Sequence, residues 1–381
     1  MKIAHITAFY TPAIGGVKQV VEELAKRQVK AGHEVHVYCS DWDKTKRIKI
    51  ENEIIDGVHV HRCKHIIRVA NFETIWFSVY SKLMKEDYDI IHSHVYGHLY
   101  FFLAGLVARR KKIPHVHTTH CPWTEDNRSR LTKVALWISY NIFCRRIMKR
   151  LDKIIAITPW EKGFIKKYGG RDEQIEFIPN GMDKVFFNKI EDNDFKEKNN
   201  IQDKLVLFFG RLNVTKAPDE FVRIAKEILK TRKNITFVIR GSDEGMKEEV
   251  KKLIAKEKRI ILLDECRDRN EIIEMYQAAD IFVLPSFREG LPLTLFEAMA
   301  SGLPIVATPV NGIPYEMKDK ENGFLVKYGD TKEFAKKILY LLDNDKKRKS
   351  IIKNNLKKAK NYTWDIISDK TLEVYNEVRR K

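Results

Sequence analysis

An α/β fold with two doubly wound parallel sheets is the architecture that the sequence predicts, and three observations support the prediction. The chain has 381 residues, whereas a single hydrophobic core stops growing near about 250–300 residues, so two domains are expected. Short apolar runs alternate with longer amphipathic segments through both halves, which is the pattern of β/α units. Runs such as Leu205–Phe209 and Ile281–Leu284 are continuously apolar, which is typical of strands covered by helices on both faces.

The first half begins with a segment that predicts a buried strand. Residues 1–9 form a short apolar run that contains His5 and Thr7 and leads into a glycine turn, unlike a secretory signal with its cleavage site. Segment Val17–Ala31 then places apolar side chains at helical spacing and ends at Gly32, a residue that can take the left-handed conformation of a helix C-cap. Further strands are expected within residues 33–40, 89–96, 114–120 and 152–159.

The second half repeats this alternation, and the sequence between the halves predicts where the domains divide. The turn Pro179–Asp183 is followed by the polar stretch Glu191–Asp203, which has the composition of a linker. We expect an N-terminal domain over residues 1–184 and a C-terminal domain over residues 185–361. Residues 362–381 contain a last helix, Trp364–Arg379, whose apolar stripe is expected to pack back on the N-terminal domain.

Composition limits the class of protein. The five cysteines are scattered and never form a C-x-x-C spacing, which argues against a disulfide framework and a zinc ribbon. No window approaches the roughly 20 apolar residues of a membrane-spanning helix. We therefore expect a cytoplasmic protein with reduced thiols and a globular fold.

The charge distribution points to an anionic partner. The net charge is +18, and about +9 of it falls between Arg109 and Lys153, where apolar side chains are interleaved with basic ones. Such a segment could lie on an anionic membrane at its inner face, or bind a lipid acceptor. An ordinary basic surface explains the same charge. No nucleic-acid-binding motif is present, so nucleic acid is not expected as a partner.

The loop Pro285–Pro292 is the densest group of chemically active residues. It follows the apolar run Ile281–Leu284 and precedes a predicted helix, so it lies at the carboxyl end of a strand, where ligands of doubly wound sheets bind. Gly290 allows close backbone approach, and the N–H groups from Gly290 onward form a phosphate site. Glu297 follows Glu289 by two helical turns, and we expect Glu297 to bind a ribose and Glu289 to face a sugar. Spacing alone is equally consistent with two solvent-exposed acids.

Two other loops carry features suited to phosphate. Arg211 and Lys216 follow the run Leu205–Phe209, and two cations at the end of a strand suit a diphosphate leaving group. Gly15 and Gly16 precede the first helix and direct backbone N–H groups to the end of the first strand. The spacing is not G-x-G-x-x-G, which disfavours a dinucleotide-dependent dehydrogenase.

Together these segments resemble the retaining family-4 glycosyltransferases of GT-B fold, from Ile3 to about Trp364. The most specific part is Ala279–Thr308, with two glutamates separated by seven residues and followed by the pattern A-M-A-S-G-x-P. The resemblance implies two Rossmann-like domains facing a cleft, with an acceptor on the N-terminal domain and a nucleoside-diphosphate sugar on the C-terminal domain. Supporting segments are Gly15-Gly16, Ile178–Asp183 and Gly210–Lys216.

The resemblance also implies roles for individual residues. Residues matching Arg211 and Lys216 hold the donor diphosphate, the one matching Glu297 binds ribose, and the one matching Glu289 lies beside the donor sugar. His120 matches a histidine that contacts the donor sugar and helps to stabilise the developing oxocarbenium ion. We thus take Glu289 and His120 as catalytic candidates, Gly16, Arg211, Lys216, Gly290, Leu291 and Glu297 as donor-binding candidates, and Tyr10, Lys18 and Arg68 as acceptor-side candidates.

Donor and acceptor identities stay open at this point. Leu291-Pro292 follows Gly290 where the family usually has Gly-Phe-Gly or a similar run, so the sugar subsite is expected to differ. The acceptor is not identified, and a glycolipid, a polysaccharide or a small polar molecule would each fit. A nucleotide-sugar epimerase or a soluble disaccharide synthase would share the donor site, and a non-enzymatic module for anionic polymers would share only the charge.

Histidines gather at two predicted strand ends. His92 and His94 alternate with Ser93 and therefore share one face of their strand. That face is expected to be covered by helices, and no carboxylate joins the group, so we expect no metal and no cofactor. The full group comprises His92, His94, His98, His115, His117, His120 and Cys121.

Overall fold

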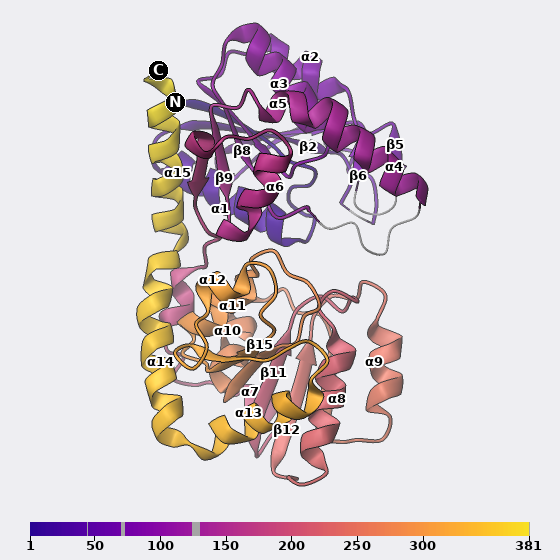
Figure 1. The fold of residues 1–381 in the computed structure, drawn as a ribbon, viewed down its shortest axis with the longest axis vertical. Coiled ribbons are helices and arrows are strands. Elements are labelled where there is room, and N and C mark those ends of the chain that lie inside the picture. The colour runs from indigo at the N-terminus through magenta and orange to yellow at the C-terminus, as the bar shows by residue number, and fades with distance from the viewer. Residues whose placement is uncertain (44, 70–72, 124–129, 381) are drawn as a thin grey trace. The chain divides into compact units, whose positions relative to one another are not determined.

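The computed structural model describes residues 1–43, 45–69, 73–123 and 130–380 (Figure 1). The chain forms two compact units. One comprises Met1–Asn180 together with Trp364–Lys381, and the other comprises Gly181–Thr363. Each unit is built on a parallel sheet with helices on its faces, which is the predicted fold class.

The first unit contains an eight-stranded sheet with the order β10-β9-β8-β7-β1-β2-β4-β3. The chain runs from β1 outward to β4 and then returns to β7 on the other side of β1. The sheet therefore has a topological switch point between β1 and β7. All the pairs are parallel except β3 with β4. The strands are β1 Lys2–Ile6, β2 Glu34–Ser40, β3 Asn52–Ile55, β4 Val58–Cys63, β7 Ile90–His94, β8 His115–Thr118, β9 Lys153–Ala156 and β10 Ile175–Phe177, with β5 Ile67–Val69 and β6 Glu73–Ile75 as a separate antiparallel pair.

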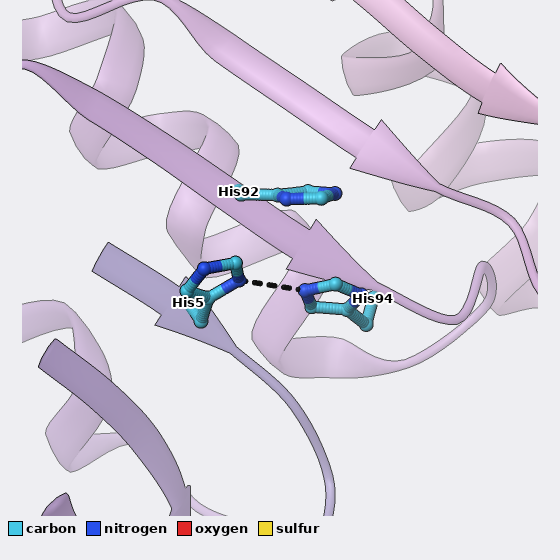
Figure 2. A group of neighbouring side chains, drawn as sticks. All are labelled: His5, His92 and His94. Carbon is cyan, nitrogen blue, oxygen red and sulfur yellow. Dashed lines mark hydrogen bonds between the residues drawn. The ribbon is translucent and has the colours of Figure 1, made fainter. Parts of the chain in front are cut away.

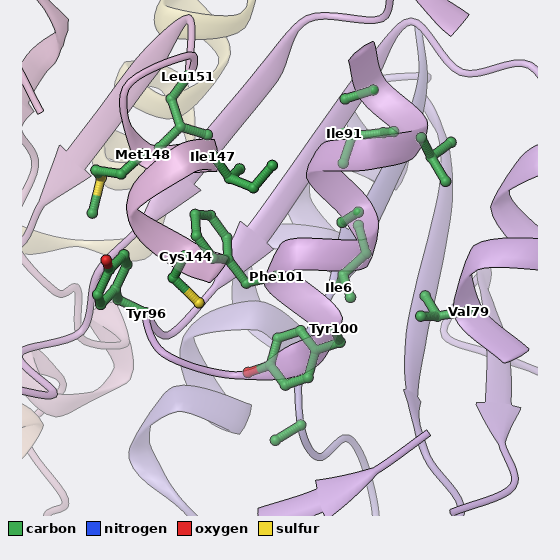
Figure 3. Packing of buried hydrophobic residues seen from close by; sticks show 14 of the residues in the cluster. Ile6, Val79, Ile91, Tyr96, Tyr100, Phe101, Cys144, Ile147, Met148 and Leu151 are labelled. Atoms are coloured by element: carbon green, nitrogen blue, oxygen red, sulfur yellow. The ribbon is translucent and has the colours of Figure 1, made fainter. Parts of the chain in front are cut away.

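Helices pack on this sheet through apolar faces. Phe101 and Tyr100 of α3 lie in a cluster that includes Ile6 of β1, Ile91 of β7 and Ile147 (Figure 3). The C-terminal helix α15 belongs to this unit and contacts α1, with buried side chains along one face. The helices of the unit are α1 Gly16–Lys30, α2 Ser78–Lys85, α3 Leu99–Lys111, α4 Arg130–Ile138, the π-helical segment η1 Ser139–Cys144, α5 Arg145–Met148, α6 Lys162–Lys167 and α15 Trp364–Arg379.

The second unit contains a six-stranded parallel sheet with the order β13-β12-β11-β14-β15-β16. The order reverses between β11 and β14, so this sheet also has a switch point. The strands are β11 Lys204–Phe209, β12 Ile235–Arg240, β13 Ile260–Leu263, β14 Ile281–Leu284, β15 Ile305–Ala307 and β16 Gly323–Leu325. The helices are α7 Phe195–Lys198, α8 Pro218–Leu229, α9 Lys247–Ile254, α10 Arg269–Ala278, α11 Leu293–Ala300, α12 Ile313–Glu316, α13 Thr331–Asp343 and α14 Asp345–Ala359.

The polar stretch 191–203, expected as a linker, lies inside the second unit. It contains α7, and Phe195 of that helix is buried. The side chain of Asn193 donates a hydrogen bond to the carbonyl oxygen of Glu274 on α10 at 2.8 Å. One buried aromatic ring and a hydrogen bond to α10 therefore hold this segment in place, although its composition is that of a solvent-exposed linker.

Across the part of the chain that the structure describes, no helix combines the length and apolar character needed to span a bilayer.

Candidate active site

An ion pair between two loops occupies the carboxyl ends of β11 and β14 in the second unit. Lys216 Nζ lies 2.7 Å from both carboxylate oxygens of Glu289. Ser286, just after β14, donates its hydroxyl hydrogen to Glu289 Oε1 at 2.7 Å. Glu289 is only 6 % exposed, so it is not a solvated loop acid. Because the pair is largely removed from water, the attraction between its charges is screened far less than at an open surface.

Backbone contacts fix the loop that carries Glu289. The N–H of Arg288 donates to the carbonyl oxygen of Thr215 at 3.2 Å, and the N–H of Gly312 donates to that of Gly290 at 3.1 Å. The side-chain amide of Asn311 donates to the carbonyl oxygen of Glu289. Asn311 has a φ of +47°, a left-handed conformation that asparagine tolerates better than most residues. The loops after β11 and β15 therefore fix the backbone of the loop that carries Glu289.

The segment after Glu289 leads into α11. Pro292 occupies the N-cap position and Leu293 begins the helix, so the backbone N–H groups that precede its first intrahelical hydrogen bond point out of this end. Gly290 is partly exposed, whereas the side chain of Leu291 is buried. Leu291 can therefore meet a ligand through its backbone but not through its side chain.

Glu297 lies about one turn from the start of α11 and is also buried, with 7 % of its surface exposed. The hydroxyl of Tyr276 on α10 donates to Glu297 Oε2 at 3.0 Å. Burial removes water from the carboxyl group and raises its pKa to about 7, against the opposing effects of the Tyr276 hydrogen bond and the charge of Arg269. A buried carboxylate of this kind gains most when a ligand supplies hydroxyl donors.

Arg211 lies in the loop after β11, and its side chain is 43 % exposed. Its guanidinium is 2.8 Å from a carboxylate oxygen of Glu244, which also accepts from the side chain of Asn213 at 2.7 Å. The prediction treated Arg211 and Lys216 as a pair of cations for a diphosphate. Within the described residues each is instead paired with its own carboxylate, so an incoming diphosphate would compete with Glu244 and Glu289 for these charges.

His120 follows β8 in the first unit and has a φ of +58°. It is partly buried, and its Nε2 lies 3.1 Å from His94 Nδ1. Burial lowers the pKa of His120 to about 3, so the imidazole is neutral near pH 7. A neutral imidazole can donate one hydrogen bond and accept another.

Glu161 anchors the segment that carries His120. Its buried carboxylate accepts hydrogen bonds from the backbone N–H of Cys121 at 2.8 Å, from the indole N–H of Trp123 at 2.9 Å and from the backbone N–H of Ile157 at 2.9 Å. These bonds join Cys121 and Trp123, which follow His120 closely, to the segment after β9. The carboxylate of Glu161 thereby fixes the left-handed turn at His120.

The acceptor-side candidates and Gly16 also lie in the first unit. Gly16 begins α1 and is exposed, with open space where a side chain would lie. Lys18 pairs with Glu22 at 2.7 Å. Tyr10 is buried, which leaves its ring little surface for an acceptor. Arg68 is on β5, and its side chain lies outside the described residues.

Comparison with known proteins identifies the family. Residues 14–185 match "Glycosyltransferase Family 4", and residues 189–358 match "Glycosyl transferases group 1". The chain is a family-4 glycosyltransferase. The glycosyltransferase is 25 % identical to a D-inositol 3-phosphate glycosyltransferase of Corynebacterium aurimucosum, over 98 % of this chain and 96 % of the relative.

Two further comparisons, one with a curated relative and one with a solved structure, agree with this assignment. It is 29 % identical to the UDP-Gal:α-D-GlcNAc-diphosphoundecaprenol α-1,3-galactosyltransferase of Escherichia coli, over 90 % of this chain and 88 % of the relative. The structure of Anabaena HepE in complex with UDP-glucose superposes with a TM-score of 0.78 at 19 % identity, covering 99 % of this chain and all of that one. The structural likeness shows the GT-B fold.

Sequence reasoning missed several residues that support the glycosyltransferase's candidate site. Ser286 and Asn311 hold Glu289, Tyr276 holds Glu297, and Glu161 holds the His120 segment. Ser286 and Asn311 follow predicted strands directly and could have been found by their place. Nothing in the sequence marks Tyr276 or Glu161, because each reaches its partner from an element distant in the chain.

Proposed function

We propose that this family-4 glycosyltransferase transfers a hexose from a UDP-sugar to a lipid-linked acceptor, with retention of configuration. Transfer from a nucleotide sugar is the activity of the family. The Escherichia coli relative is named for a UDP-galactose donor and a diphosphoundecaprenol-linked acceptor, and the HepE structure holds UDP-glucose. These names support a uridine donor and a lipid-linked acceptor.

The Lys216–Glu289 contact of 2.7 Å is the observation that carries the proposed donor site. Lys216 and Arg211 would neutralise the diphosphate, together with the backbone N–H groups from Gly290 onward. Glu289 would face the donor sugar. The charge that stabilises the leaving group thus touches the carboxylate that faces the reacting carbon.

The remaining roles follow from the same arrangement. Glu297 would accept hydrogen bonds from the ribose hydroxyls, since its carboxylate is buried and close to the start of α11. His120 would accept or donate a hydrogen bond at the donor sugar as positive charge develops on the ring. In same-face attack the leaving phosphate takes the acceptor proton, so no dedicated protein base is needed.

A thermal-shift panel tests the donor proposal. UDP and UDP-hexoses should raise the unfolding temperature more than GDP, ADP and their sugars, because a ligand at about 100 times its Kd adds about 2.7 kcal/mol to stability. Ribose 5-phosphate serves as a control for nonspecific anion binding. A panel without any nucleotide-dependent shift would contradict the donor site, and a larger shift with GDP or ADP would contradict the choice of base.

A lipid-linked acceptor requires the enzyme to work at a membrane, and an exposed apolar surface on the first unit supports such a location. We define the α4–η1 surface by Val134, Trp137, Ile138, Ile142 and Phe143, all exposed, with Val134 59 % and Trp137 58 % exposed. Exposed cations flank it along the same helical stretch. Apolar side chains beside cations suit the interface of an anionic bilayer. The exposed cations are Lys133, Arg145, Arg146, Lys149 and Arg150.

Replacing Trp137 by glutamate should weaken binding to vesicles that contain phosphatidylglycerol by roughly tenfold. The change removes an apolar contact and adds a charge that the anionic surface repels. Co-sedimentation measures the bound fraction, and the UDP-induced thermal shift should stay unchanged. The matched control is Phe177→Glu, because Phe177 is an exposed aromatic residue on β10 of the same unit. Equal losses for the two variants would contradict a role for the α4–η1 surface.

A further inference from the structure

Three histidines lie together on one face of the first unit's sheet, at its switch point. His5 is on β1 opposite His92 on β7, and His94 follows two residues later on β7 (Figure 2). All three are fully buried. Their ligand atoms lie within 4.8 Å of one another, which is close enough to consider a metal as well as a hydrogen-bonded group.

The hydrogen bonds distinguish these two possibilities. His5 Nδ1 is 2.9 Å from His94 Nε2, His5 Nε2 is 2.7 Å from Gln28 Oε1, and His94 Nδ1 is 3.1 Å from His120 Nε2. His92 lies 2.5 Å from the Tyr375 hydroxyl through Nδ1 and 2.7 Å from the Thr118 hydroxyl through Nε2. All six ring nitrogens of the three histidines therefore have partners. A metal would have to displace the contact between His5 and His94.

Gln28, His5, His94 and His120 form a hydrogen-bonded series, and donors and acceptors can be assigned along it in this order. An amide oxygen can only accept, so His5 Nε2 carries the proton and donates to Gln28. His5 is neutral, because burial lowers its pKa to about 4, and its Nδ1 must then accept from His94 Nε2. The same reasoning makes His94 Nδ1 accept from His120 Nε2. His120 is thereby left with a proton on Nε2 and a lone pair on Nδ1.

The direction in which the hydrogen bonds of this series run depends on the orientation of the Gln28 side-chain amide. Its nitrogen is 3.4 Å from the hydroxyl oxygen of Tyr375 on α15. This hydroxyl can accept from the amide and donate to His92 Nδ1, with His92 Nε2 then donating to Thr118. If the amide were reversed, every proton from His5 to His120 would move to the other nitrogen.

We propose that Gln28, His5 and His94 are positioning residues that hold His120 as its Nε2–H tautomer. Nδ1 of His120 is then a hydrogen-bond acceptor, and the group that it recognises is a hydroxyl of the donor sugar. Tyr375 sets the amide of Gln28 and so links the C-terminal helix to the tautomer. The inference rests on the proposed role of His120 at the donor sugar, whereas the tautomer itself can be measured without any substrate.

The test uses the full chain with ¹⁵N-labelled histidine, observed by long-range ¹H–¹⁵N correlation, with the His120 signals assigned from a His120→Asn variant. The wild type should show the Nε2–H tautomer at His120. Gln28→Leu removes the terminal acceptor, and Tyr375→Phe removes the hydroxyl that orients the amide. Both variants should give His120 as a mixture of tautomers, and the milder Tyr375→Phe keeps the test available if Gln28→Leu does not fold.

Kinetics complete the experiment. Gln28→Leu should lower kcat roughly 10- to 100-fold, as expected for the loss of one hydrogen bond to the donor sugar, while the UDP-induced thermal shift stays at its wild-type value. Ser93→Ala is the matched control, because Ser93 is on the same strand but bonds to His115 and His117. It should leave both the His120 tautomer and kcat unchanged.

Each contrary result has a distinct meaning. An Nδ1–H tautomer in the wild type, or an unchanged tautomer in both variants, would overturn the inference. Stoichiometric metal bound by the purified protein and lost on His5→Phe substitution would also overturn it. A changed tautomer with unchanged kcat would overturn the catalytic link. Failure of the proposed donor site would appear separately, as the absence of any nucleotide-induced shift in the wild type.

Discussion

Glu289→Gln should slow turnover roughly 10²- to 10³-fold while nucleotide affinity is retained or improved. The carboxylate that is expected to face the donor sugar would stabilise positive charge in the transition state, and an amide carries no charge to do so. Ser286 can still donate to the amide oxygen, so the loop keeps this support. Lys216 loses a charged partner at 2.7 Å, and its full charge becomes available to the diphosphate.

The matched control for this change is Glu244→Gln. Glu244 pairs with Arg211 as Glu289 pairs with Lys216, so each variant frees one cation. We expect both to bind UDP at least as tightly as the wild type, but only Glu289→Gln to lose turnover. Steady-state kcat and calorimetric UDP affinity measure the two effects. Equal losses of turnover in the two variants would contradict a special role for Glu289.

The fold was predictable because strands buried on both faces leave continuous apolar runs. Residues 204–209 and 281–284 are such runs and became β11 and β14. Strands β3, β5 and β6 gave no such signal, because they are short and mix polar with apolar residues. The polar stretch 191–203 was predicted wrongly as a linker, since composition does not reveal that Phe195 is buried.

The candidate site was predictable as a set of loops but not as a set of contacts. Glu289 and Lys216 were each placed in a loop at the carboxyl end of a predicted strand, yet their pairing across 73 residues is not visible in spacing. Their burial likewise depends on the loops around Thr215 and Asn311, which support the Glu289 segment. The hydrogen-bonded series from Gln28 to His120 depends on four residues, which α1, β1, β7 and the turn after β8 bring together. Tertiary packing, and not local sequence, creates these contacts.

Glu297→Gln should stabilise the free enzyme by about 3 kcal/mol at pH 8 and hardly at all below pH about 4.5. The pKa of Glu297 is about 7 in the folded protein, against an ordinary value of 4.5. The folded state therefore holds this proton more tightly than the unfolded state does. Its contribution to stability is fully present below pH 4.5 and is lost as pH rises to about 7, where the buried group ionises. Urea unfolding of both proteins at several pH values measures the difference.

The same substitution should weaken UDP binding about 10- to 100-fold at pH 8, because hydrogen bonds to a charged acceptor contribute about 1.5–3 kcal/mol. We then compare the two proteins by the ratio of their UDP affinities, wild type over Glu297→Gln. This ratio should fall by up to tenfold for each unit that the pH is lowered below about 7, because only the ionised carboxylate is the strong acceptor. Taking the ratio cancels titration of the nucleotide's own phosphate. Tyr276→Phe is the matched variant: it removes the hydrogen bond that lowers the Glu297 pKa, so the fall should begin at a higher pH. If Glu297→Gln gains stability without losing UDP affinity, Glu297 is a buried acid outside the donor site. If it gains stability and loses UDP affinity, the free enzyme holds a destabilising buried charge, and hydrogen bonds from the ribose hydroxyls offset that charge when UDP binds.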